Sequence, residues 1–384
     1  MVAAVRQGES ARAVGRRFHR ALKTVQYWLT RAGTLPLDLV DWGDRPSRPQ
    51  QSPRRTSAAV EQQILETRQT LRTVSDLGEY GAVAIHAALT EAGVCGVPSL
   101  RTINRVLERH GAFDGQRRQR WPAPPRGWYL PDVATGLAEL EQFDVIEGLI
   151  LEGQGEVQVL TGIALHSGLC VAAPTPTVTA TFVSDTLLAH WQAVGCPAYI
   201  QFDNDTRFQG PHQHPDVIGR VMRLALGLGI TVVFAPPRET GFQAAIESFN
   251  GRFQQKVWAR FHHDDLPALQ ACTARYLAAV LRRCAPRFEA APARHAVPPD
   301  WKPDWQALPT GTVIYLRRTD DQGRIVVLGH TIPVTPDWAR RLVRAEVCLP
   351  DGPIRIYALR RRAPQEHPLL REKDYALPRR PFEE

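Results

Sequence analysis

Three acidic residues in the central part of the chain are placed so that they could act together. Asp144 lies within a predicted strand, Asp203 directly follows another predicted strand, and Glu247 lies on a predicted long helix. Any one of them alone is ordinarily a solvated side chain or a helix cap. Together they would offer hard oxygen ligands to two divalent cations, an arrangement that suits in-line displacement at phosphorus. Magnesium (Mg²⁺) is the expected ion, and Mn²⁺ can substitute for it.

The residues around these acids resemble a known family. The chain reads Glu-Gln-Phe-Asp at 141–144, Gln-Phe-Asp-Asn at 201–204 and Gln-Ala-Ala-Ile-Glu-Ser-Phe-Asn-Gly at 243–251, the last after a pair of prolines. In this order the segments resemble the superfamily of retroviral integrases and bacterial insertion-sequence transposases. That superfamily has a strand-ending Asp-Asn and a helical Gln-x-x-Val/Ile-Glu-x-x-Asn. The resemblance covers roughly 140–285.

This resemblance implies both a fold and an activity. It implies an RNase H-like integrase catalytic core over 139–290, in which Asp144, Asp203 and Glu247 are the catalytic residues and the ligands of two metal ions. The implied activity is that of a transposase or integrase, which cleaves a DNA strand at the end of a mobile element and joins its 3′ end to target DNA. A water or a DNA 3′-hydroxyl is the attacking group, so no protein nucleophile is required.

The second segment departs from the family pattern. Asp205 and Arg207 stand where the family has Gly and Glu, and the 43 residues between Asp203 and Glu247 exceed the usual spacing. We assign the excess to a surface loop at 210–218. Asp205 is the main rival as a metal ligand.

Other acids and histidines are weaker candidates for metal ligands. Glu147 lies three residues after Asp144, which on a strand is the opposite face. Glu141 and Glu239 are further acids close to the three segments in sequence. Four histidines lack the Cys/His spacing of a metal site and are expected to be solvent-exposed; these are His212, His214, His262 and His263.

The hydrophobic pattern from 141 onward predicts an α/β unit with a mixed sheet. Three short β-rich runs come first, and helices then alternate with strands. The predicted strands are 143–151, 157–166, 169–174, 198–202 and 230–235. The predicted helices are 182–194, 217–228, about 243–261 and about 266–284.

Two helical segments precede this unit, and each matches a helix-turn-helix pattern. They cover 1–33 and 58–113, and in each the last helix has one apolar face and one polar, partly basic face. Any small three-helix bundle shares this pattern, but two such units in series suit a long asymmetric site on double-stranded DNA. The residues expected to contact DNA, including three on the helix that carries Glu247, are Lys23, Gln26, Tyr27, Arg31, Arg101, Asn104, Arg105, Asn250, Gln254 and Lys256.

Basic, proline-rich linkers are predicted at 34–57 and 114–138. Trp121, Trp128 and Tyr129 are interleaved with arginines in the second linker. Such aromatic residues can stack on unpaired bases, although packing onto a neighbouring domain is the more common outcome.

Five further short strands, separated by turns at 320–323 and 350–352, indicate a small β-barrel over 308–362. The fold prediction is therefore multidomain. It comprises N-terminal all-α helix-turn-helix units, a central α/β RNase H-like catalytic domain with a mixed sheet, and a C-terminal small β-barrel.

Composition agrees with a polyanionic partner. The 47 basic residues exceed the 39 acidic ones, and only four of the basic residues are lysines. Arginine can reflect genome composition, but its planar guanidinium also grips phosphate oxygens in pairs. Six separated cysteines without a CxxC pair predict reduced thiols and no zinc module. With no long apolar stretch, the expectation is a cytoplasmic, nucleoid-associated bacterial protein that has no membrane partner.

The expected partners are double-stranded DNA, as mobile-element ends and target, and further copies of this chain. A homo-multimer on DNA is expected because two ends must be cut and joined, which takes two active sites. Two alternatives stay open. The chain could be an inactive or domesticated relative that only binds DNA, or a metal-dependent nuclease that cleaves without joining.

Overall fold

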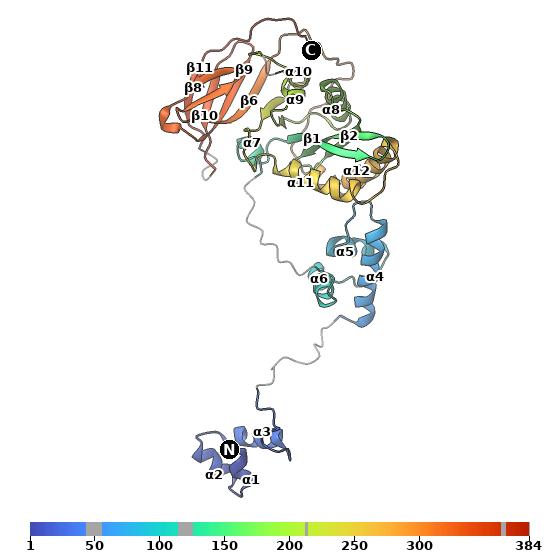
Figure 1. Cartoon of the computed structure of the whole chain (residues 1–384), viewed down its shortest axis with the longest axis vertical. Coiled ribbons are helices and arrows are strands. Elements are labelled where there is room, and N and C mark those ends of the chain that lie inside the picture. Colours follow the sequence, from blue (N-terminus) through green and yellow to red (C-terminus); the bar gives the residue numbers. More distant parts are fainter. Residues whose placement is uncertain (44–55, 114–125, 212–213, 362–365, 384) are drawn as a thin grey trace. The chain divides into compact units, whose positions relative to one another are not determined.

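The computed structural model describes residues 1–43, 56–113, 126–211, 214–361 and 366–383 (Figure 1). The chain divides into two compact units, Met1–Glu61 and Gln62–Glu384. Among the described residues, no helix has both the length and the apolar character that a membrane span needs.

Three short helices lie within residues 1–43 of the first unit. Ser10 caps the second of them by accepting a hydrogen bond from the backbone N–H of Ala13 at 3.3 Å. Val2, Ala32 and Val40 form a small buried core. The helices are α1 (Val2–Arg6), α2 (Ala11–Arg17) and α3 (Leu22–Ala32).

A second group of three helices lies between residues 58 and 109. The last of them is capped by Ser99, which accepts from the backbone N–H of Thr102. It buries Ile103, Val106 and Leu107, which form the apolar face predicted for this helix. The helices therefore stand where the sequence placed them, and a helix-turn-helix geometry stays a prediction. They are α4 (Ala58–Val74), α5 (Ala82–Glu91) and α6 (Leu100–Arg109).

One nine-stranded sheet carries most of the second unit, with the strand order β11-β10-β9-β6-β5-β4-β1-β2-β3. β1, β2 and β3 pair antiparallel, whereas β1, β4 and β5 run parallel. This is the mixed sheet that the sequence predicted. The five strands are β1 (Leu140–Leu151), β2 (Gly155–Ala164), β3 (Cys170–Thr175), β4 (Tyr199–Phe202) and β5 (Thr231–Phe234).

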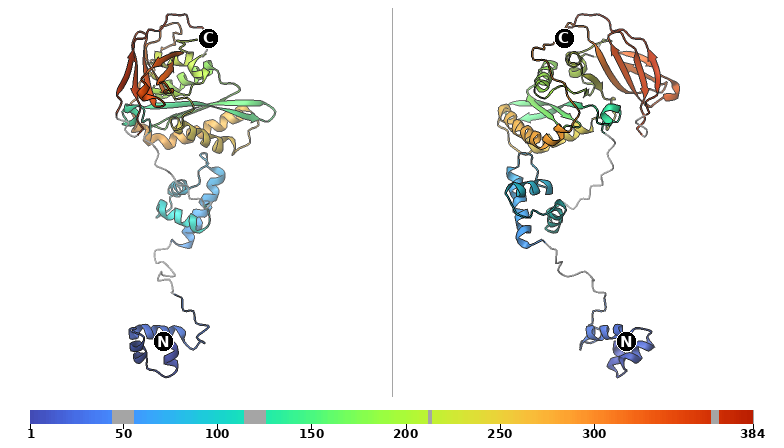
Figure 2. Two further views of the ribbon diagram at one scale, coloured as in Figure 1. Left: turned by 60° about the vertical axis from the view of Figure 1, so that its left-hand side comes forward. Right: turned by 180° about the vertical axis from the view of Figure 1, so that it is seen from behind.

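Helices cover both faces of this part of the sheet (Figures 1 and 2). On one face α8 and α10 share a core with Phe143 and Phe202, and on the other α11 and α12 pack against Ile146 and Val159. Side chains alternate along a strand, so Asp144 shares the face of Ile146 and lies under α11. The helices of this region are α7 (Pro131–Ala134), α8 (Ala180–Val194), α9 (Thr206–Gln209), α10 (Arg220–Gly227), α11 (Ala244–Phe253), η1 (Gln254–Trp258) and α12 (Leu266–Glu289).

The C-terminal strands extend this sheet, which corrects the prediction of a separate small barrel over 308–362. β6 (Gly311–Arg318) pairs in parallel with β5, and β9 (Leu342–Leu349), β10 (Ile354–Ala358) and β11 (Leu369–Lys373) follow as antiparallel neighbours. Four consecutive residues of β6, 313–316, are buried, so this strand needs cover on both faces, as a central strand has. A hairpin of β7 (Arg324–Val327) and β8 (His330–Pro333) packs into the same core as α8 and α10, and η2 (Pro336–Trp338) follows it.

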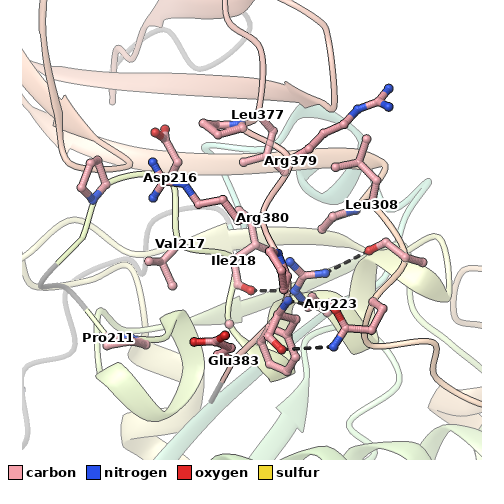
Figure 3. A pocket seen from close by; sticks show the side chains of 18 residues that line it. Pro211, Asp216, Val217, Ile218, Arg223, Leu308, Leu377, Arg379, Arg380 and Glu383 are labelled. Atoms are coloured by element: carbon pink, nitrogen blue, oxygen red, sulfur yellow. Dashed lines mark hydrogen bonds between the residues drawn. The ribbon is translucent and has the colours of Figure 1, made fainter.

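A cavity of about 590 Å³ lies between the C-terminal tail and α10 (Figure 3). The tail is tied down by Gln306, whose amide exchanges two hydrogen bonds with the backbone of Phe382, at 3.0 and 3.1 Å. Arg223 donates to the carbonyl oxygens of Ile218 and Ala307, at 3.0 and 2.9 Å. None of the three acids predicted to be catalytic lines this cavity, so it is distinct from the candidate active site.

Candidate active site

Asp144 and Asp203 occupy neighbouring positions on adjacent parallel strands. β1 and β4 pair with Gln142 opposite Gln201. Asp144 follows Gln142 by two residues and is still within β1. Asp203 follows Gln201 by two residues and comes directly after β4. The pairing register therefore brings the two acids together, as their placement in the sequence predicted.

A buried amide network places the start of α11 beside these strands. Gln142, which is 2% exposed, donates to the carbonyl oxygens of Phe242 and of the Gln201 side chain, at 2.8 and 2.7 Å. Its own side-chain oxygen accepts from the backbone N–H of Ile246 at 3.2 Å. Glu247 is the next residue along the helix. The network therefore holds the third acid near the first two.

Asn250 ties α11 directly to Asp144. Its amide donates to Asp144 Oδ2 at 2.8 Å and accepts from the Thr161 hydroxyl at 2.7 Å. Asn250 had been expected to contact DNA, but in the structure its amide is engaged with Asp144. It therefore orients this carboxylate, a role that sequence reasoning missed.

The three acids share one electrostatic environment. Burial raises the pKa of Asp144 to about 6, and the negative charges of Asp203 and Glu247 add to this shift, against the hydrogen bonds from Val145 N–H and Asn250. Burial also raises the pKa of Asp203, with further contributions from neighbouring carboxylates. The cluster concentrates negative charge that a bound cation would relieve.

The donor set suits a hard cation, although its side chains are not arranged around one. Among the described residues, no three His, Cys, Asp or Glu side chains are grouped closely enough to hold a metal ion. Asp144 Oδ1 accepts from Val145 N–H at 2.8 Å, and Asp203 Oδ1 accepts from Asp205 N–H at 3.0 Å. Carboxylate oxygens are nevertheless the ligands that Mg²⁺ and Mn²⁺ prefer. The carboxylate groups of Asp144, Asp203 and Glu247 are therefore ligands of the type that the predicted ions prefer.

Arg207 forms an ion pair with Asp205, the main rival as a metal ligand. Its guanidinium grips both oxygens of Asp205, at 2.9 and 2.5 Å, and also donates to Glu147 at 2.8 Å. Asp205 additionally caps α9 by accepting from the backbone N–H of Arg207. These bonds neutralise Asp205, so Asp205, Arg207 and Glu147 form an ion-pair cluster beside Asp203.

The Glu147 side chain lies near Asp203, contrary to the prediction from strand periodicity. Strict alternation predicted that it points away from the site, yet it bonds to Arg207 and its charge acts on Asp203. The pairing of β1 with β2 shifts between Ile146 and Leu149, which is a bulge or similar irregularity. Such an irregularity re-aims the following side chains, and nothing in the local sequence pattern announced it.

The two remaining acids are engaged elsewhere. Glu141 is buried and paired with Arg294 at 2.6 Å, His190 at 3.1 Å and the Trp191 indole at 2.9 Å. Burial alone would raise the pKa of Glu141, but these partners outweigh it and lower the pKa to about 2. Glu239 forms an ion pair with Arg318. Both acids therefore have structural partners.

Most residues predicted to contact DNA have exposed side chains. They are Lys23, Gln26 and Tyr27 on α3, Arg101, Asn104 and Arg105 on α6, and Gln254 in η1.

Two of the predicted DNA contacts are turned inward. The Arg31 side chain is only 5% exposed, lies over the Trp28 ring, and bonds to Asp41 and the Gly43 carbonyl. Lys256 donates to the carbonyl of Gly78 at 2.8 Å. The predicted helix 243–261 changes from α to π at 254–258, which rotates Lys256 away from the position that α-helical spacing would give it.

Two aromatic residues of the second linker pack inside the protein. Trp128 and Tyr129 are each 2% exposed and contact Phe242. The packing alternative therefore holds for both, whereas Trp121 lies outside the described residues.

The histidines predicted to be exposed differ in their burial. His214 and His262 are exposed, as predicted, but His263 is buried against Trp258, with its ring nitrogen 3.2 Å from the carbonyl oxygen of Val257. His212 lies outside the described residues.

Comparison with known proteins gives matches among solved structures, while no family model and no curated protein matches. A chain of the simian T-cell lymphotropic virus intasome in complex with PP2A regulatory subunit B56 gamma is 16% identical over 70% of this chain and 87% of its own, with a TM-score of 0.33. The HTLV-2 integrase catalytic core domain in complex with magnesium is 13% identical over 43% and 86%, with a TM-score of 0.25. The BIV integrase catalytic core domain is 22% identical over 36% and 80%, with a TM-score of 0.28. Since all three TM-scores are below 0.5, the functional case rests on the residues of the site.

Proposed function

We propose that this protein is a transposase or integrase that cleaves DNA at mobile-element ends and joins the 3′ ends to target DNA. One observation carries the proposal. Asp144 and Asp203 follow matching positions of the adjacent parallel strands β1 and β4, and Asn250, three residues after Glu247 on α11, donates to Asp144 at 2.8 Å. Such a group of carboxylates suits two-metal phosphoryl transfer.

Asp144, Asp203 and Glu247 would hold two Mg²⁺ or Mn²⁺ ions. When bound, these ions supply activation of the attacking water or 3′-hydroxyl and stabilisation of the leaving 3′ oxygen. The chain's own contribution is positioning: Asn250 orients the Asp144 carboxylate, and Gln142 holds the first turn of α11.

The helical segments would bind the DNA ends. The exposed polar faces of α3 and α6 support this role, with Lys23, Gln26 and Tyr27 on the first and Arg101 and Arg105 on the second. Arginine and lysine side chains give affinity through phosphate contacts. Because two ends are processed together, the working form would be a homo-multimer on DNA in the bacterial cytoplasm, associated with the nucleoid.

The test is cleavage and strand transfer on DNA that carries the ends flanking this reading frame, with Mg²⁺ or Mn²⁺. Wild type should cut and join, whereas Asp203→Asn and Glu247→Gln should bind the DNA normally and do neither. Glu152→Gln is the matched control, because Glu152 is an exposed acid in the turn after β1. Its activity should equal that of wild type.

The two alternatives give different products. A chain that only binds DNA would shift the labelled ends without cutting them in either metal. A nuclease that does not join would release cleaved ends and leave target DNA unlinked. Cleavage that survives in Asp203→Asn or Glu247→Gln would show that other ligands carry the metal.

A further inference from the structure

A pocket of about 420 Å³ lies beside α11 on the side facing the end of α12. Three arginines from separate segments line it: Arg126 before α7, Arg252 on α11 and Arg287 near the end of α12. We name it the three-arginine pocket. None of these three arginines has a role in the proposed cleavage and joining reactions.

Backbone carbonyl groups gather two of these arginines at one place. Arg126 donates to the carbonyl oxygen of Leu165 at 2.8 Å. Arg287 donates to the carbonyl oxygens of Leu165 and His166, at 3.2 and 2.8 Å. Both guanidinium groups are therefore drawn to the end of β2 by neutral acceptors, which position their charge without cancelling it.

Arg252 of α11 adds a third positive charge to the lining. Its Nε donates to the Ser248 carbonyl on its own helix at 3.3 Å, and its guanidinium lies 5.9 Å from the centre of the Phe249 ring. Within the described ranges, none of the three arginines forms an ion pair with a carboxylate. Each guanidinium has five N–H donors, so several stay free for an anion.

The pocket is lined by residues of α11 and β1, the elements that carry Glu247 and Asp144, although none of the three acids lines it. Ala244, Ala245 and Ser248 of its lining flank Glu247 on α11, and Gln142 of its lining precedes Asp144 by two residues. Along the axis of α11, Ala244, Ala245 and Ser248 lie within about one helical turn of Glu247.

The rest of the lining suits part of a nucleotide. Ile163, Ala244 and Ala245 present apolar surface that can pack against a deoxyribose. Three guanidinium groups around such a surface match the paired oxygens of a phosphate.

We infer that the three-arginine pocket binds a backbone phosphate of the DNA strand that enters or leaves the active site. This inference rests on the proposed function for the identity of the ligand as DNA. It differs from the expected contacts of Gln254 and Lys256, because Arg252 and Arg287 line a separate pocket. The strand could belong to a mobile-element end or to the target.

The test compares Arg252→Gln and Arg287→Gln with Arg282→Gln, a matched loss of one positive charge from an exposed side chain of α12 outside the pocket. DNA affinity is measured against salt concentration in the full-length protein, once with flanking-end duplex and once with unrelated plasmid as target. Each pocket variant should weaken binding by about tenfold and lower the salt slope by about 0.9. Arg282→Gln should leave both quantities unchanged. Arg287 also bonds to backbone carbonyl groups, so thermal unfolding of Arg287→Gln checks that a loss of DNA binding is not a loss of folding. Arg252 is exposed, so Arg252→Gln should fold normally and tests the pocket by itself.

The source of the strand follows from which DNA is affected. Loss confined to the flanking-end duplex assigns the phosphate to the element, and loss confined to plasmid binding and strand transfer assigns it to the target. If Arg252→Gln binds both DNAs as Arg282→Gln does, the inference is overturned while cleavage by wild type still upholds the proposed function. If the pocket variants weaken binding but wild type cleaves nothing, the pocket stands and the proposed function fails.

Discussion

Gln142 should control the position of Glu247 through its buried hydrogen bonds to α11 and β4. Its side chain lies inside the protein, between β4 and the first turn of α11. The N-cap residue of α11, Gln243, provides no side-chain cap, so the Ile246 N–H depends on Gln142 Oε1. We therefore choose Gln142→Met, which keeps a side chain of similar length and removes every polar contact.

The magnitude follows from the bonds that are lost. The N–H of Ile246 is left buried without an acceptor, which costs about 1–3 kcal/mol. The Tyr129 hydroxyl lies 2.5 Å from the side-chain oxygen of Gln201 and 3.0 Å from the carbonyl oxygen of Phe242, and its one hydrogen can serve one of them. The loss at the other oxygen adds about 1 kcal/mol. The expected fall in the free energy of unfolding is therefore about 2–4 kcal/mol.

The larger effect should be on catalysis. A displacement of about 1 Å in a catalytic group can reduce the rate about a hundredfold. Gln142→Met should lower kcat for strand cleavage on that scale and leave DNA affinity within a factor of about two of wild type. Urea unfolding, single-turnover cleavage and DNA binding measure the three quantities. The exposed Gln62→Met on α4 is the control and should change none of them.

A Gln142→Met variant that unfolds like wild type and cleaves at the wild-type rate would refute this reasoning. It would mean that the packing of Ile246 and Phe249 places α11 without help from the amide network. Equal losses in DNA affinity and in kcat would also contradict it, because a pure positioning residue does not bind substrate.

Three further predictions concern single acids. Asp205→Asn should keep metal-dependent cleavage within about fivefold of wild type, because Asp205 is occupied by Arg207; loss as complete as in Asp203→Asn would make Asp205 a ligand. The raised pKa of Asp144, about 6 against an ordinary 3.8, means that its contribution to stability is lost as pH rises through this range. Asp144→Asn should therefore increase the free energy of unfolding of the metal-free protein at neutral pH by up to about 3 kcal/mol, which is measured as a higher Tm. An unchanged or lower Tm would refute the idea that the Asp144 carboxylate is destabilising in the metal-free protein. The pKa of Glu141 is lowered to about 2 from an ordinary 4.5, so its contribution is complete above pH 4.5 and lost as pH falls toward 2. Urea unfolding across that range should show a steeper loss for wild type than for Glu141→Gln, and parallel curves would refute the assignment.

Local sequence patterns were sufficient for most elements that carry the candidate site. The apolar runs of β1, β4 and β5 and the helical spacing around Glu247 each report burial within one segment. Burial periodicity is a property of neighbouring residues, so it survives in the sequence. The placement of Asp144, Asp203 and Glu247 on strand, strand end and helix follows from those segments alone.

Contacts between distant segments could be decided only by the tertiary structure. Nothing near β6 in sequence states that it pairs with β5 rather than closing a separate barrel, because pairing depends on which edge is free in space. The irregularity in β1 that re-aims Glu147, and the π-helical turn that redirects Lys256, are small backbone changes without a periodic signal. Asn250 likewise resembles an exposed helix residue until α11 is laid across Asp144.

The sequence by itself therefore determined which residues could supply the chemistry, since carboxylates and their local elements are encoded residue by residue. The tertiary structure decided which side chains are free to act. Arg31 and Glu141 have the right chemistry for DNA or metal, yet the fold brings partners that bond to them, the Gly43 carbonyl to Arg31 and the Arg294 guanidinium to Glu141. Ion pairs and hydrogen bonds across the fold form only once packing has set their distances, and that information is spread over the whole chain.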